Sequence, residues 1–176
     1  EYNNVTVVEG DFMKIDLPSF IDEHFSDIIA DGGTVSVCAN LPYYITTPVI
    51  MKILESFTPT ERIPLSSVTV MVQLEVADRI CSNQTSDEYG SVTASIGLAA
   101  KGKKLFNVSA GNFYPAPSVT SAVMRLTPHE NGIYDVYPEA PTDREECEKF
   151  AADVKKTIAA AFSKRRKTLA NALSSV

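Results

Sequence analysis

The sequence lacks the long apolar runs and the paired cysteines that would place it in a membrane or an oxidising compartment. No uninterrupted apolar stretch reaches eighteen residues and no signal-peptide pattern occurs, so we expect a soluble, cytoplasmic protein. The three cysteines, at positions 38, 81 and 147, are odd in number, far apart and never in a C-x-x-C pair. A disulfide framework or a zinc site is therefore not expected. His24 and His129 lack partners for a metal site or a triad, and no metal is predicted.

Positive charge is also scarce. Lysine and arginine number 16 against 22 acidic residues, which gives a net charge of −6 and argues against a surface coated in nucleic-acid-binding charge. Seven of the 16 basic residues nevertheless fall in two runs, "KGKK" at 101–104 and "KRRK" at 164–167. An acidic body with two local basic patches remains compatible with a specific nucleic-acid partner.

Alternating strand and helix patterns indicate an α/β fold. Short β-branched or apolar runs predict strands at 5–8, 34–39, 67–73, 103–110 and 118–128, and helical patterns fall at 46–57, 74–82 and 89–100. This order predicts a mostly parallel sheet with helices on both faces. The last two strands have no helix between them, so they predict an antiparallel hairpin at one edge. Residues 28–33 are predicted to form a turn.

The C-terminal part of the chain has a different character. Prolines and glycine gather around 128–141, which predicts a domain boundary near 130–141. A helix is then expected, with Thr142 as its cap and an apolar face at four-residue spacing, formed by Phe150, Val154, Ile158 and Phe162. A second short helix is expected from about residue 168.

The stretch "NLPYY", residues 40–44, is the strongest candidate for chemistry. In open α/β sheets ligands bind beyond the carboxyl ends of the strands, and Asn40 ends a predicted strand. Pro42 disfavours a helical Leu41, so backbone carbonyls can point into a cleft beside the Asn40 amide oxygen. Two acceptors next to an aromatic ring suit a flat base that carries an amino group. The alternative is a strand-ending turn with Tyr43 or Tyr44 packed in the core.

Other candidates are weaker. Asp11, Gln73 and Glu75 also follow predicted strands, and Asp11 taken alone is more often a turn residue than a ligand. The loop "GNFYPAP" could present a rigid ring, Phe113, to the other side of the same base, although proline-braced aromatics more often serve packing. The run 164–167 could neutralise phosphates, or it could be a solvated helix end.

Taken together, these segments resemble the KsgA-type small-subunit ribosomal RNA adenine-N6 dimethyltransferase family. The resemblance rests on segments that occur in the family's order across nearly the whole chain: "ANLPYYIT", "MVQLEVADRI", "EYGSVTA", "FYPAPSVTSAVMRLTPH" and "AFSKRRKTLANAL". It implies a partial class I, Rossmann-like methyltransferase sheet with an antiparallel edge hairpin and a small C-terminal all-α domain. Residues 1–132 would be the C-terminal part of the catalytic domain, and 133–176 the start of a helical RNA-binding domain.

The resemblance also implies a reaction and its residues. The family transfers methyl groups from S-adenosylmethionine to N6 of two adjacent adenines near the 3′ end of small-subunit rRNA, within an immature ribosomal subunit. Carried over by position, the residues that hold the target base would be Asn40, Leu41, Pro42, Tyr43 and Phe113. Those that meet the cofactor would be Asp11, Phe12 and Asn40, and those that meet rRNA phosphates Lys164, Arg165, Arg166 and Lys167.

The family's Gly-rich cofactor turn has no counterpart in the sequence, since no G-x-G occurs. We therefore expect a fragment of a longer protein, inactive alone, that binds S-adenosylmethionine weakly or not at all. Two alternatives stay open. One is an adenine methyltransferase with another target, either large-subunit rRNA, as in macrolide resistance, or DNA. The other is a non-catalytic RNA-binding ribosome-assembly factor.

Overall fold

The structure is a computed structural model and describes residues 4–57, 63–164 and 169–174. Its strands are β1 (Val35–Asn40), β2 (Leu65–Gln73), β3 (Ala100–Val108) and β4 (Ser121–Pro128). Its α-helices are α1 (Leu17–Ala30), α2 (Thr46–Ser56), α3 (Leu74–Ile80), α4 (Ser91–Gly97), α5 (Arg144–Phe162) and α6 (Leu169–Leu173). Four short 3-10 helices complete it: η1 (Phe12–Lys14), η2 (Tyr43–Ile45), η3 (Ala110–Asn112) and η4 (Gly132–Asp135).

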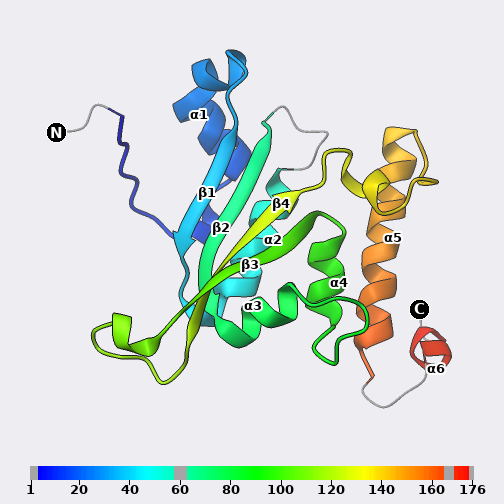
Figure 1. The fold of residues 1–176 in the computed structure, drawn as a ribbon. Helices are drawn as coiled ribbons and strands as arrows, with labels where there is room; N and C mark the ends of the chain where they lie inside the picture. Colours follow the sequence, from blue (N-terminus) through cyan, green and yellow to red (C-terminus); the bar gives the residue numbers. More distant parts are fainter. Residues whose placement is uncertain (1–3, 58–62, 165–168, 175–176) are drawn as a thin grey trace.

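The four strands form one mixed sheet in the order β1-β2-β4-β3 (Figure 1). Strands β1 and β2 are parallel and connected through α2, whereas β4 runs antiparallel to both β2 and β3. The predicted edge hairpin is therefore confirmed as the β3–β4 pair. The prediction of a mostly parallel sheet is wrong for the described strands, because only one of the three strand pairs is parallel.

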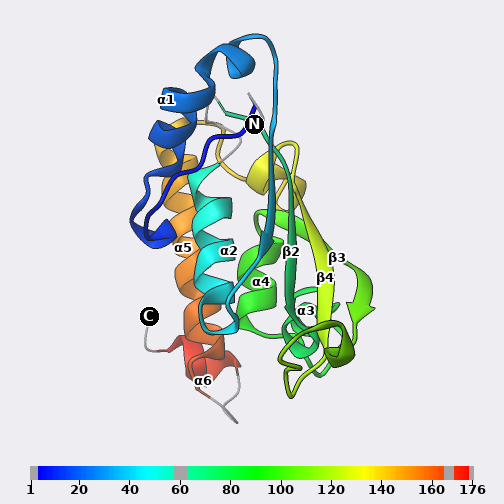
Figure 2. The same ribbon diagram turned by 90° about the vertical axis from the view of Figure 1, so that its left-hand side faces the viewer.

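Helices cover one face of this sheet. Figure 2 shows α1, α2, α4 and α5 on the same side of the sheet. The buried residues of β2 and β4 belong to the same core cluster as the buried residues of α2 and α4. The core is made of fully buried apolar residues from these layers, including Ile50, Ile53, Val68, Val70, Val72, Ile96, Met124 and Leu126. The prediction of helices on both faces is wrong for the described residues: the opposite face of the sheet carries no described helix. That open face presents the alternate, more exposed residues of each strand.

The N-terminal segment departs from the predicted pattern. Val5 to Val8 was predicted to form a strand, but the structure assigns it no strand, and its valines are exposed, Val7 to 87%. A β-strand is stable only when a neighbouring strand takes up its backbone hydrogen bonds. No described strand pairs with this segment, so its β-branched composition alone does not make it a strand.

Helix α1 was not predicted, although the sequence carries its start signal. The Asp16 side chain accepts a hydrogen bond from the backbone N–H of Ser19 at 3.2 Å, and Pro18 occupies the first turn. An aspartate followed by proline is a recognised N-terminal helix signature. The predicted turn before β1 is shorter than expected: the helix continues to Ala30, and Gly32 turns the chain with a positive φ of 85°.

Helix α5 lies along α4 on the helical side (Figure 1). Its half-buried face carries Phe150, Val154 and Ile158, as predicted, and the ring of the more exposed Phe162 meets the ring of Tyr89. The cap is Asp143 rather than Thr142, because the Asp143 carboxylate accepts from the Glu146 N–H at 3.0 Å. Helix α6 follows where a second helix was expected, and the division at 132/133 stays a prediction.

Candidate functional site

An open cleft of about 390 Å³ lies where β1 ends. Its wall comes from two segments far apart in the sequence, the loop after β1 and the loop between η3 and β4. The lining residues are Asn40, Leu41, Pro42, Tyr43, Phe113, Tyr114, Pro115 and Pro117. The structure thus brings together all five residues predicted to hold the target base. One loop follows the first strand in the chain and the other precedes the last strand, so the two become neighbours only in the folded protein.

The loop after β1 is fixed by backbone bonds. The Leu41 N–H donates to the Met71 carbonyl of β2 at 3.4 Å, and the Leu41 side chain is buried. The Pro42 carbonyl then accepts from the Ile45 N–H at 3.1 Å and from the Thr46 hydroxyl at 3.2 Å. The Pro42 carbonyl is therefore occupied by the turn that starts α2. The exposed Asn40 side chain has no hydrogen-bond partner among the described residues.

Tyr43 is held by a residue that sequence reasoning did not single out. Its phenolic oxygen lies 2.7 Å from the hydroxyl oxygen of Ser121, the first residue of β4, and Ser121 is completely buried. The bond fixes the tilt of the Tyr43 ring at the cleft wall. The only sequence signal for Ser121 is its place in the "SVTSAVMRL" segment, which says nothing of a partner 78 residues away.

Phe113 reaches the cleft from a loop that is braced locally. The Asn112 side-chain amide donates to the Ser109 carbonyl and hydroxyl at 3.3 and 3.0 Å, and the Phe113 N–H donates to the Ala110 carbonyl at 3.2 Å. Phe113 itself is half-buried, whereas the ring of Tyr114 is fully exposed. Among the ring contacts of the described residues, Tyr43 and Phe113 do not form a pair. The two rings line one cleft without stacking on each other.

Asp11 and Phe12 lie elsewhere among the described residues and do not line the cleft. Asp11 caps η1 by accepting from the Met13 N–H at 3.0 Å, and its carboxylate is exposed. Phe12 packs against the core beneath the Lys52 ammonium, which lies 5.9 Å from the centre of the ring. Their predicted cofactor role stays a prediction.

The remaining candidate residues are Glu75 and Gln73, which belong to secondary-structure elements, and the basic run at 164–167. Glu75 forms an exposed ion pair with Arg79 at 2.8 Å, one helical turn along α3, and Gln73 is the half-buried last residue of β2. Of the predicted phosphate-binding run, Lys164 is exposed, and Arg165, Arg166 and Lys167 lie outside the described residues.

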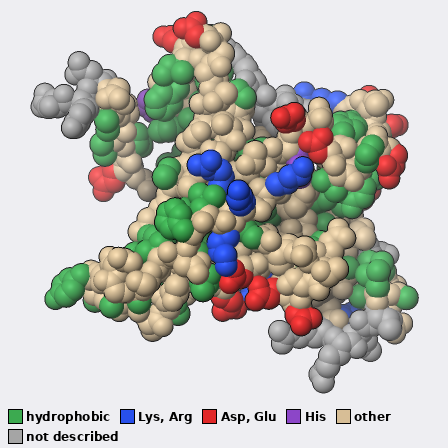
Figure 3. Space-filling model, in the orientation of Figure 1, with side chains coloured by type: hydrophobic (Ala, Val, Ile, Leu, Met, Phe, Trp, Pro, Cys, Tyr) green, Lys and Arg blue, Asp and Glu red, His purple; other side chains and the backbone are tan. Residues whose placement is uncertain are grey.

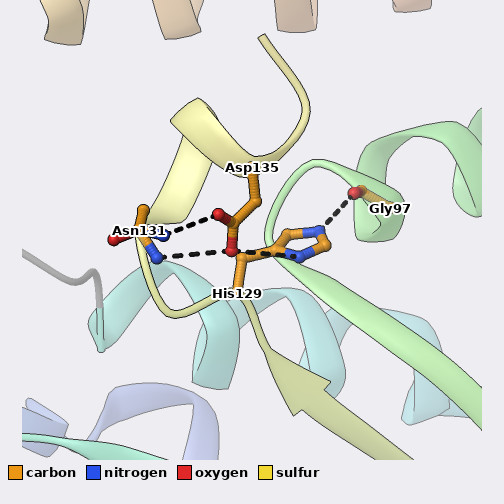
Figure 4. Close-up of polar contacts among 4 residues, drawn as sticks. All are labelled: Gly97, His129, Asn131 and Asp135. Atoms are coloured by element: carbon orange, nitrogen blue, oxygen red, sulfur yellow. Dashed lines mark hydrogen bonds and ion pairs between the residues drawn. The ribbon is translucent and has the colours of Figure 1, made fainter. Parts of the chain in front are cut away.

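A second, larger cavity of about 980 Å³ lies between α3, α4, β3, η4 and α5. His129, at its wall, is buried and joins three elements (Figure 4). One ring nitrogen, Nε2, donates to the Gly97 carbonyl at 2.9 Å, and the other, Nδ1, lies 4.0 Å from the Asp135 carboxylate. Hydrogen bonds from the Asn131 side chain and backbone lower the pKa of Asp135. His129 therefore ties the end of β4 to α4 through Gly97 and to η4 through Asp135, a structural arrangement that we call the His129–Asp135 brace.

No group of three or more metal-ligating side chains gathers anywhere in the described ranges. Within the same ranges, no helix has the length and apolar character needed to cross a membrane.

Solved structures with similar folds define the class of protein. The chain matches a dimethyladenosine transferase from Plasmodium falciparum with a TM-score of 0.65 and 27% identity, over 97% of this chain and 50% of that one. It also matches the 23S rRNA methyltransferase ErmE with a TM-score of 0.56, where 17% identity shows the fold alone. That match covers 93% of this chain and 64% of the other. The fold is that of the class I methyltransferases.

Sequence comparison narrows the class to a family. The family "Ribosomal RNA adenine dimethylase" matches residues 1–176, and the chain belongs to that family. The ribosomal RNA small subunit methyltransferases A of Oceanobacillus iheyensis and Alkaliphilus oremlandii are 40% and 42% identical to it over 173 residues. These alignments cover 98% of this chain but only 52% and 53% of the relatives. The chain therefore spans about half their length, and the resemblance predicted from sequence is confirmed.

Proposed function

We propose that this chain is the target-base-holding part of an rRNA adenine-N6 dimethyltransferase that modifies two adjacent adenines near the 3′ end of small-subunit rRNA in an immature subunit. The observation that supports this proposal is the cleft, which is lined by an exposed amide, Asn40, together with two aromatic side chains, Tyr43 and Phe113. The relatives named as small-subunit rRNA methyltransferases support the same substrate class.

The chemistry follows from the target amine. The lone pair of an adenine amino group is delocalised into the ring, so the amine is a poor nucleophile until its hydrogens are held in a defined geometry. The Asn40 amide oxygen and the Leu41 carbonyl would accept those two hydrogens, and Tyr43 and Phe113 would stack on the two faces of a base flipped out of the RNA. Positioning of this kind can supply several orders of magnitude in rate.

S-adenosylmethionine is proposed as the methyl donor, and it would supply an electrophilic methyl group on a sulfonium. The residues present fit only part of it. The exposed Asp11 carboxylate can accept from an adenine amino group, and the neighbouring Phe12 N–H forms no backbone hydrogen bond among the described residues. An acceptor beside a donor matches the edge of an adenine ring.

Replacement of Asn40 tests the proposal. In the full-length gene product, Asn40→Ala should lower methyl incorporation into undermethylated small subunits by about a hundredfold or more, because the amine loses a positioning acceptor. RNA affinity should change less than about twofold. The matched control is Asn107→Ala, an exposed asparagine of β3 outside the cleft lining. Full turnover by Asn40→Ala, or methyl incorporation only into large-subunit RNA, would overturn the proposal.

A further inference from the structure

The strands carry a charge distribution opposite to that of the whole chain. Strands β1 to β4 hold Lys101, Lys103, Lys104 and Arg125 but no aspartate or glutamate, in a protein with a net charge of −6. All four basic residues are exposed. Figure 3, which views the open face of the sheet, shows basic side chains gathered over β3 and β4 near the centre of the molecule.

The lysines on the two sides of β3 differ in whether they form an ion pair. Gly102 faces the helical layer, since a side chain there would meet the Cys81 sulfur of the α3 end at 3.3 Å. Lys104 has the same parity and forms an ion pair with Asp78 of α3. Lys101 and Lys103 alternate with them and therefore point to the open face. Neither forms a hydrogen bond or ion pair with another described residue.

On the open face, like charges lie opposite each other. Lys103 is the direct cross-strand partner of Arg125, and Arg125 is in turn the partner of Thr69 on β2. The Arg125 Nε donates to the Thr69 hydroxyl at 3.1 Å, which orients the guanidinium but neutralises no charge. Like charges directly opposite in a sheet are destabilising. Lys101 lies about 7 Å along the strand from Lys103, so the arrangement concentrates three cations, none of which forms an ion pair with a described residue.

This cluster lies on the same face as the predicted base-holding residue. Asn40 pairs with Met71, and Met71 with Val123, two residues along β4 from Arg125. Two strand spacings of about 5 Å and two residues of about 3.4 Å place Arg125 on the order of 12 Å from Asn40. A polyanion whose base enters the cleft can therefore reach the cluster with a backbone group one or two nucleotides away.

We propose that Lys101, Lys103 and Arg125 form a docking surface for the sugar–phosphate backbone of the RNA whose base enters the cleft. The proposal rests on the proposed function for the identity of the RNA. A phosphate oxygen accepts charge-assisted hydrogen bonds from the guanidinium and ammonium groups, and its charge relieves the repulsion between Lys103 and Arg125. Lys104 takes no part, because Asp78 already compensates it.

Adjacent lysines on opposite faces of one strand give the test. The probe is a fluorescein-labelled RNA hairpin with two adjacent adenines in its loop, and fluorescence anisotropy gives its affinity for the full-length gene product across a salt series. The double variant Lys101→Gln/Lys103→Gln should flatten the slope of log affinity against log salt by about 1.4 to 1.8, since each lost phosphate contact contributes about 0.7 to 0.9. Lys104→Gln should leave the slope unchanged. The variant Lys101→Arg/Lys103→Arg should retain the slope of the unmodified protein.

Equal slopes for the unmodified protein and the Lys101→Gln/Lys103→Gln variant would overturn the proposal, as would an equal flattening by Lys104→Gln, which would reflect net charge alone. Thermal melting of each variant shows whether the fold is intact. Asn40→Ala, measured alongside, separates the two proposals: its slope should match the unmodified protein. If Asn40→Ala lowers methyl transfer but Lys101→Gln/Lys103→Gln leaves the salt slope unchanged, only the docking surface is refuted. If Lys101→Gln/Lys103→Gln flattens the salt slope but Asn40→Ala leaves methyl transfer unchanged, only the proposed chemistry is refuted.

Discussion

At the residue scale, the cleft depends on a few fixed neighbours rather than on many contacts. Tyr43 has one hydrogen bond that sets its ring, to a serine that is fully buried. A buried hydroxyl without a hydrogen-bond partner destabilises the folded state, because it has lost its hydrogen bonds to water and gained none in the protein. This effect is larger than the contribution of a hydrogen bond between exposed groups. The Tyr43–Ser121 pair should therefore affect both stability and the geometry of base stacking.

Tyr43→Phe tests this pair. The change leaves the Ser121 hydroxyl without its partner, so the free energy of unfolding, measured by urea denaturation, should fall by about 1 to 3 kcal/mol. Ser121→Ala added to Tyr43→Phe should cost less than the sum of the single changes, since the second change removes the group left unsatisfied. Methyl transfer should suffer less from Tyr43→Phe than from Tyr43→Ala, which removes the ring. Strictly additive costs would mean that the bond does not form in solution.

At the same scale, sequence reasoning found the base-holding residues but not the one that orients them. Asn40, Pro42 and Tyr43 are adjacent in the chain, so their residue types and order predict a local structure. Phe113 was found through its prolines and the family resemblance. Ser121 was missed because its role comes from a contact between β4 and the loop after β1, and nothing in the sequence near it reports that contact.

At the scale of secondary-structure elements, the His129–Asp135 brace joins β4, α4 and η4 (Figure 4). The Asn131 side chain and backbone donate to the Asp135 carboxylate and lower its pKa, so the folded state favours the charged form. A lowered carboxyl pKa adds stability above the ordinary value of 3.8, and that stability is lost as the pH falls through the folded-state pKa.

Asp135→Asn tests the pH dependence of the brace. The variant should unfold at a lower urea concentration than the unmodified protein near pH 7, because it removes the charge that these hydrogen bonds favour. The difference should shrink as the pH falls below the ordinary aspartate pKa of 3.8, because the unfolded chain then takes up a proton that the folded state still disfavours. Asp87→Asn, an exposed aspartate outside the brace, controls for the loss of one negative charge. A difference that stays constant from pH 7 to pH 3 would contradict this account.

Helices and strands were predicted where the local pattern and the tertiary neighbours agree. Helix α2 was predicted from its apolar spacing, and the residues of that spacing, Val49, Ile53 and Leu54, are all buried. The strand predicted at Val5 to Val8 failed because strand formation needs a partner, which no local pattern supplies. Helix α1 was not predicted, although Asp16 and Pro18 supply its start signal.

At the scale of the whole molecule, the described residues form one sheet that helices cover on one face and leave open on the other (Figure 2). Most of the buried apolar side chains lie between the sheet and the helices. The segment at 5–8 contributes no buried residue to that core, which predicts a large difference in local stability between it and the central strand β2.

Amide hydrogen exchange should show this difference. The amides of Val5 to Val8 form no backbone hydrogen bonds among the described residues and should exchange at rates close to those of an unstructured peptide. The amides of Val70 and Val72, in the middle of the sheet, should be among the slowest, because they open only with much of the domain. Strong protection at 5–8 would show that this segment pairs with another strand in solution.

The sequence by itself determined the family, the class of fold and the residues at the end of β1, because these depend on short local patterns of residue type. Only the tertiary structure decided that Phe113 reaches the same cleft as Asn40 and that Ser121 holds Tyr43. It also decided that Lys103 and Lys104 point to opposite faces of one strand, toward different partners. The physical reason is that these features are distances between groups far apart in the chain, which strand order and register fix and which local residue preferences do not encode.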